Sequence, residues 1–182
     1  MPVTDAVVES AKYPVGRFKA GPAGTAEQRQ AWVETIAAAP AEFARLVAGL
    51  TDAQKATPYR DGGWTIAQVV HHVADSHLNA YARCRWALTE TDFTVKPYKQ
   101  ALWAEFADAT SLDVTPSLDM LRGLHQRWVT LLRAMSPAQW DTKLMHPENG
   151  PMTLDSLIQL YAWHSKHHAA HVSNAKQQHG WQ

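Results

Sequence analysis

Residues 153–180 read "TLDSLIQLYAWHSKHHAAHVSNAKQQHG", and this stretch predicts one long helix with histidines on its apolar face. Thr153 and Ser156 are typical of a helix N-terminus, and Gly180 is typical of a C-terminus. At about 100° per residue, His164 and His168 continue the stripe of leucines that precedes them. We therefore expect two imidazoles, one turn apart, to face the protein interior.

Three other segments have helical periodicity: residues 25–50, 65–89 and 116–135. Pro40 lies inside the first of them and is expected to kink or restart that helix, because proline cannot donate the interior hydrogen bond. No segment has a clear strand pattern. Four long helices favour an all-α fold, a four-helix bundle.

The segments between these helices are longer than a minimal bundle needs, and they are predicted to carry short extra helices. A capping-box pattern predicts one short turn from Thr51, and the spacing of aromatic residues predicts a short helix at about 98–107. Residues 1–24 contain "YPVGRFKAGPAG", whose Pro and Gly content favours an extended N-terminal arm. The bundle domain would then span residues 25–182.

The composition excludes several classes of partner. The 17 basic and 17 acidic residues cancel, which gives no reason to expect nucleic acid or an anionic membrane. The single cysteine, Cys84, excludes an internal disulfide and a Cys-rich zinc motif. Since neither a signal peptide nor a long apolar run is visible, a cytoplasmic location is expected.

A second histidine cluster, "VVHHVADSH" at residues 69–77, lies almost a hundred residues before the first. On a helical wheel, His72 lies beside the apolar stripe and on one line with four polar residues: Asp75, Ser76, Asn79 and Arg83. This line is either a solvated face or a polar wall that lines a cleft at the mouth of the bundle.

His72, His164 and His168 together would suit a divalent ion. Three neutral imidazoles are the ligand set of an open zinc site, and nickel also accepts them. However, H-x-x-x-H spacing is common, and a buried histidine is more often a core residue with satisfied hydrogen bonds. The spacing alone supports both interpretations equally. Surface or supporting positions are expected for His71, His77, His167 and His171.

Several motifs together resemble the DinB-like superfamily, and in particular its YfiT-like branch of metal-dependent hydrolases. They are "YPVGRF", "TPYRDGGWTIAQVVHHVADSHLNAYAR", "LHQRWVTLLR" and "YAWHSKHHAAH", and they extend from about Tyr13 to Trp181. The resemblance implies a four-helix bundle with one divalent ion per chain, held by His72, His164 and His168. It also implies a homodimer. Relatives in the superfamily transfer thiols such as bacillithiol to electrophiles.

Three functions follow as hypotheses. In the first, the ion activates water, and the protein hydrolyses a small molecule with help from Asp75, Asn79 and Arg83. In the second, the ion activates a low-molecular-weight thiol for transfer, and Arg83 binds an anionic part of that thiol. In the third, the ion is stored or structural and the protein is no enzyme; a fourth protein ligand, such as His167 or His171, would indicate this.

Overall fold

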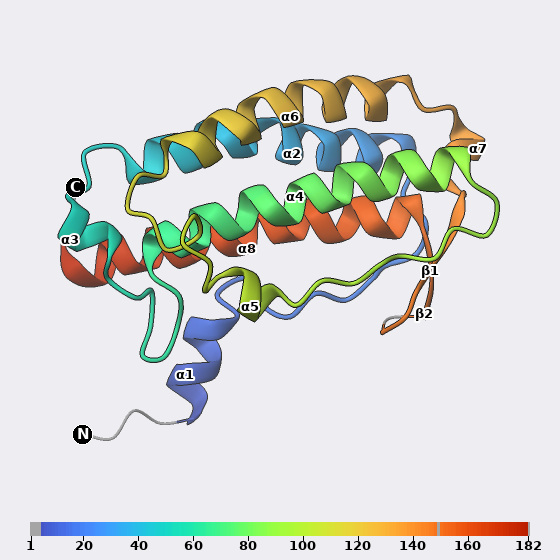
Figure 1. The fold of residues 1–182 in the computed structure, drawn as a ribbon. Helices are drawn as coiled ribbons and strands as arrows, with labels where there is room; N and C mark the ends of the chain where they lie inside the picture. Colours follow the sequence, from blue (N-terminus) through green and yellow to red (C-terminus); the bar gives the residue numbers. More distant parts are fainter. Residues whose placement is uncertain (1–4, 149, 182) are drawn as a thin grey trace.

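Four long helices form the body of the protein. The computed structural model describes residues 5–148 and 150–181, with side chains from residue 9 onward. The long helices are α2 (Ala26–Val47), α4 (Ile66–Thr89), α6 (Thr115–Ala134) and α8 (Leu154–His179). They run side by side in Figure 1. The predicted four-helix bundle is confirmed.

The order of the helices around the bundle explains the long connections. α2 packs against α6 and α8, and α4 packs against the same two helices. Helices that follow one another in sequence, α2 and α4 or α6 and α8, are therefore diagonally opposite. A connection that crosses a bundle end diagonally has to span more than one helix diameter, of about 10–12 Å. The segments 48–65 and 135–153 cover these two diagonals.

Four of the helices begin with a threonine capping box, of which the sequence indicated the one at Thr51 and a helix start at Thr153. The threonines at their N-caps accept a backbone N–H from the third helical residue, whose side chain bonds back to the N-cap N–H; these are Thr25, Thr51, Thr65 and Thr153. α8 ends at Gly180, which has the left-handed backbone conformation with φ +66°. These local hydrogen bonds satisfy helix-end groups that would otherwise lack partners.

Pro40 neither divides the first bundle helix nor restarts it. α2 continues through Pro40 as one helix of 22 residues, so of the two expected alternatives, a kink or a restart, the restart is wrong. Proline has no N–H to donate to the carbonyl of Ile36, one turn earlier. That carbonyl accepts instead from Nδ1 of His125 on α6, at 2.7 Å. A side chain of a neighbouring helix thus replaces the missing backbone donor.

The N-terminal arm is only partly extended. A short helix, α1 (Asp5–Lys12), occupies residues that the Pro and Gly content had assigned to an extended chain. The following segment lies on α8. The Gly21 N–H donates to the side chain of Gln159, and the Gly24 N–H donates to the carboxylate of Asp155. The same carboxylate, which is buried, accepts from Arg29 of α2 at 2.7 Å.

Small elements fill the connections. Three are short helices: α3 (Asp52–Lys55), α5 (Gln100–Trp103) and α7 (Pro137–Trp140). The helix expected over 98–107 is therefore shorter than predicted. A hairpin of β1 (Lys143–His146) and β2 (Gly150–Thr153) was not predicted. The strands pair antiparallel, Leu144 opposite Met152. Four residues are too few to establish an alternating pattern in sequence.

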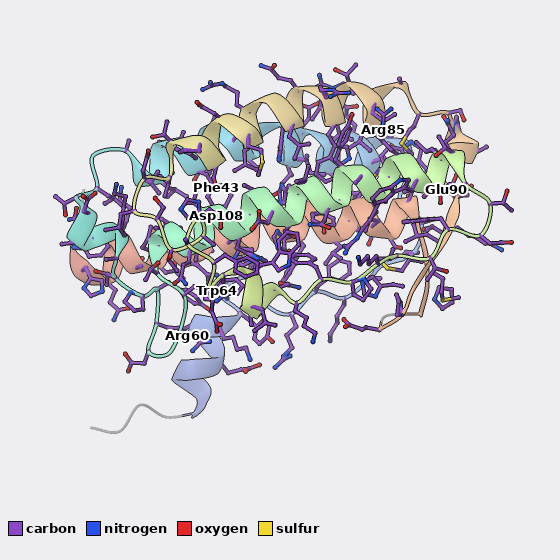
Figure 2. All side chains as sticks on the ribbon, in the orientation of Figure 1. Phe43, Arg60, Trp64, Arg85, Glu90 and Asp108 are labelled. Carbon is purple, nitrogen blue, oxygen red and sulfur yellow. The ribbon has the colours of Figure 1, made fainter. Side chains whose placement is uncertain are left out.

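The core contains polar as well as apolar side chains. Phe43, labelled in Figure 2, and Trp128 are among the largest fully buried side chains. The rings of His77 and His125 meet the Trp128 ring edge-on, with centroids 5.9 and 5.8 Å apart. These two imidazoles are almost completely buried and need internal hydrogen bonds. None of the helices described is long and apolar enough to cross a membrane.

Candidate metal centre

A cavity of about 370 Å³ opens between α4, α8 and the segments that cover them. α4 and α8 supply most of its polar wall. Lys12 and Tyr13 close it from the N-terminal segment, and His146 and Glu148 close it from the hairpin. Trp64, labelled in Figure 2 on the side of the bundle that carries α1 and α5, covers His72 with ring centroids 4.5 Å apart.

The three histidines that the sequence singled out meet in the wall of this cavity. One nitrogen from each of His72, His164 and His168 lies within 4.8 Å of the others. The Nε2 atoms of His72 and His164 are 3.3 Å apart. A tetrahedral ion with Zn–N bonds of about 2.0–2.1 Å holds two ligand nitrogens about 3.3 Å apart. The side chains present therefore fit a zinc-sized ion.

Burial keeps these imidazoles in the neutral form that binds metal. Desolvation lowers the pKa of His72 to about 3, and lowers the pKa values of His164 and His168 well below 6.5. Neighbouring histidines lower them further. At neutral pH each ring thus has one N–H and one lone pair, and the arrangement of hydrogen bonds decides which nitrogen has which.

A chain of histidines determines the tautomer of His164. The Ile36 carbonyl can only accept, so His125 donates through Nδ1 and its Nε2 is the acceptor. His77 then donates from Nδ1 to that Nε2 at 2.8 Å, and its own Nε2 accepts from Nδ1 of His164 at 3.2 Å. The lone pair of His164 is left on Nε2, the atom that faces His72.

A second chain acts on His168. Nε2 of His171 donates to the carbonyl of Lys12 at 3.2 Å, so its Nδ1 accepts from Nδ1 of His168 at 3.3 Å. The lone pair of His168 is then on Nε2. His167, His168 and His171 form a second group with metal-ligand spacing. The hydrogen bond between His168 and His171 uses Nδ1 of both residues and leaves Nε2 of His168 free, which favours the group with His72.

We expect His125→Leu to weaken zinc binding by roughly 10-fold to 100-fold, the range found when partners of ligand histidines are removed. His125→Leu leaves Nδ1 of His77 without its acceptor. The hydrogen bonds then no longer keep the lone pair of His164 on Nε2. His125→Gln, whose amide can both donate and accept, should restore most of the affinity. Competition with a chelator measures both variants. An unchanged zinc affinity in His125→Leu would contradict the role of the hydrogen bonds that link His125, His77 and His164.

Only some of the other residues that the sequence suggested lie at the cavity. Arg83 lines the cavity, whereas Asp75 and Asn79 do not. The Asn79 amide donates to the backbone carbonyl of Asp75, and among the described residues no hydrogen bond joins the Asp75 side chain to His72. His71 also points elsewhere, with bonds to Ser117 and the Ser111 carbonyl.

The sequence interpretation missed several residues of the site. Ser76, Tyr98 and Tyr161 line the cavity, and His125 supports the site through its hydrogen bond with His77. Tyr161 lies on the same helix face as His164, and Ser76 lies on the same face as His72, so the helical wheels could have indicated both. His125 and Tyr98 had no comparable signal, because they come from segments whose place in the bundle the sequence does not reveal.

Known proteins resemble this chain over nearly its whole length. The DinB superfamily matches residues 26–172. Two relatives are named "Putative metal-dependent hydrolase". GK0616 of Geobacillus kaustophilus is 45% identical, covering 97% of this chain and 99% of the relative. YfiT of Bacillus subtilis is 41% identical, covering 93% and 96%.

A solved structure agrees with this likeness. YfiT from Bacillus subtilis, described as "a probable metal-dependent hydrolase with an unusual four-helix bundle topology", superposes with a TM-score of 0.92 at 40% identity. The match covers 95% of this chain and 99% of that one. In sequence and in fold, this chain belongs to the DinB superfamily.

Proposed function

We propose that the protein is a metal-dependent hydrolase of small molecules, with zinc, or alternatively nickel, held by His72, His164 and His168. The observation that carries the proposal is the convergence of three neutral imidazoles in the wall of an open cavity. Structural zinc sites have four protein ligands, whereas catalytic sites have three. When bound, such an ion lowers the pKa of a coordinated water to about 7 and polarises a carbonyl group.

The remaining histidines support a reactive site rather than a storage site. A fourth ligand from His171 would lose the hydrogen bond at the nitrogen that bound the ion: the bond from His168 at Nδ1, or the bond to the Lys12 carbonyl at Nε2. The ring of His167 stacks on Trp163, with centroids 4.3 Å apart and planes 19° apart. Each of these imidazoles thus has a packing or hydrogen-bonding role of its own.

One observation favours thiol transfer as a second candidate. Among the described residues, Glu148 of the hairpin turn is the only carboxylate that lines the cavity, and it is exposed. Hydrolysis profits from a general base positioned beside the attacking water. Attack by a metal-activated thiol needs no such base, because the ion itself favours the thiolate.

Metal-loaded protein offered two reporter reactions distinguishes these candidates. An ester such as p-nitrophenyl acetate reports hydrolysis, and a small thiol with monochlorobimane reports transfer. We expect metal-dependent ester hydrolysis that is lost in His164→Ala and retained in His179→Gln, a surface histidine of the same helix. Thiol transfer without hydrolysis would establish the second candidate. Stoichiometric metal with neither activity would argue against both.

A further inference from the structure

A buried arginine in the cavity lacks a partner of opposite charge. Arg83 is only 7% exposed, and no described carboxylate lies within ion-pairing distance of it. Its guanidinium makes two long hydrogen bonds, to the hydroxyl of Tyr161 and to the carbonyl of Lys96, both at 3.4 Å. An unpaired buried charge is costly, and the partially buried Arg29 by contrast has two carboxylates.

A second group in the same wall also lacks a well-placed partner. The hydroxyl of Tyr98 is buried and makes no well-formed hydrogen bond among the described residues, although the Ser76 hydroxyl is near enough to interact with it. Tyr98 lines the cavity together with Arg83. A buried polar atom without a partner normally has a ligand or a water in the functional state. Two residues with hydrogen-bond donors therefore line the same cavity from different segments, one from α4 and one from the loop before α5.

These donors lie close to the candidate metal centre. Ser76 Oγ is 3.4 Å from Nε2 of His164 and 3.4 Å from the Tyr161 hydroxyl, which in turn is 3.4 Å from Arg83. A molecule of a few carbon atoms could thus reach from the three histidines to the guanidinium. Lys12 adds a further positive charge to the lining, and Glu148 is the only described negative charge there.

We propose that Arg83 and Tyr98 form a carboxylate-binding subsite, and that the protein acts on small carboxylates whose reacting bond lies a few atoms from that group. The guanidinium fork matches the two oxygens of a carboxylate. The tyrosine hydroxyl would donate to one of them. The position of the reacting bond rests on the proposed function, whereas binding of the carboxylate does not.

The subsite can therefore be tested without metal. In the presence of a chelator and at constant ionic strength, glutarate should raise the melting temperature by a few degrees, and uncharged glutaramide should not. Arg83→Gln should abolish the glutarate effect. Arg85→Gln is the matched control: Arg85 is exposed and lies two residues along α4, which places it on the opposite side of the helix (Figure 2).

A second experiment uses protein loaded with cobalt. The absorption of the ion measures the dissociation constants of 3-mercaptopropionate and 3-mercaptopropionamide, which differ only in charge. We expect the carboxylate to bind roughly 10-fold to 100-fold more tightly. Tyr98→Phe, which removes one hydroxyl and keeps the ring, should reduce this preference several-fold; it serves as the informative variant if Arg83→Gln does not fold.

The proposed subsite would be contradicted if the charged and uncharged compounds gave equal shifts in melting temperature and equal dissociation constants. A glutarate effect that survives in both Arg83→Gln and Tyr98→Phe would overturn it as well. A glutarate effect that needs both residues, in a protein that binds no metal, would support the subsite and contradict the proposed function. The two proposals can thus fail separately.

Discussion

His164→Ala is expected to lower the affinity for zinc by roughly 100-fold or more. Complete zinc sites with four ligands have apparent binding free energies of about 10–16 kcal/mol, so each ligand contributes roughly 3 kcal/mol. His164 is also the ligand whose free nitrogen is directed by the chain through His77 and His125. Competition with a chromophoric chelator at pH 7.5 gives the affinity.

His179→Gln is the control for this measurement, since His179 is an exposed residue near the end of the same helix. Its affinity should equal that of the parent. His167→Ala tests the competing group of His167, His168 and His171, and should have a much smaller effect than His164→Ala. Tight binding in His164→Ala together with loss in His167→Ala would move the metal site to that second group.

The metal-free protein is expected to lose stability steeply as the pH falls from about 6.5 to about 4. In the unfolded chain an imidazole takes up a proton near pH 6.5, whereas burial lowers the pKa of His125 to about 4. Between these values the unfolded state binds more protons, so the free energy of unfolding falls with falling pH. Above pH 6.5 both states are neutral and this contribution is constant.

The expected loss from His125 alone is about 3 kcal/mol. The pKa values of His72, His167 and His171 are lowered similarly, to about 3, 4 and 4, mainly by desolvation. Since a domain has only about 5–15 kcal/mol of stability, four such residues together remove a large part of it on acidification. Urea unfolding with chelator at several pH values gives the slope.

His125→Gln provides the test of this cause. Because glutamine does not titrate, the variant should lose less stability than the parent between pH 6.5 and pH 4.5. His179→Gln should follow the parent curve, since His179 is exposed. A flat stability curve of the parent in this range would show that the buried histidines are not kept neutral by the fold.

Much of the fold could be predicted from local sequence. Thr153 and Gly180 indicated where the last bundle helix begins and ends, and the helical segments expected from residues 25 and 65 begin within one residue of those positions. These features depend on hydrogen bonds within a few residues. The helix at the N-terminus and the hairpin after α7 were missed, because both are built from short segments that give little periodicity to recognise.

The candidate site was only partly accessible to the same reasoning. The wheels placed His164 and His168 on one helix face and His72 on another, and the structure brings the three together. The wheel also placed Asp75 and Asn79 on the line of His72, yet neither lines the cavity. A helical wheel assigns an angle to a residue, but the positions of the neighbouring helices and loops decide what that angle faces.

The bundle helices, several of their caps and the i, i+4 pair of imidazoles could be predicted from the sequence, since all of these depend on residues within one or two turns. The packing of the helices brings His72 to this pair, because α4 and α8 lie side by side. It also decides which nitrogens are free for an ion. That choice depends on the Ile36 carbonyl, left without a backbone donor by Pro40, and on the Lys12 carbonyl. Both are far from the ligands in sequence, and hydrogen bonds across helices connect them to the site.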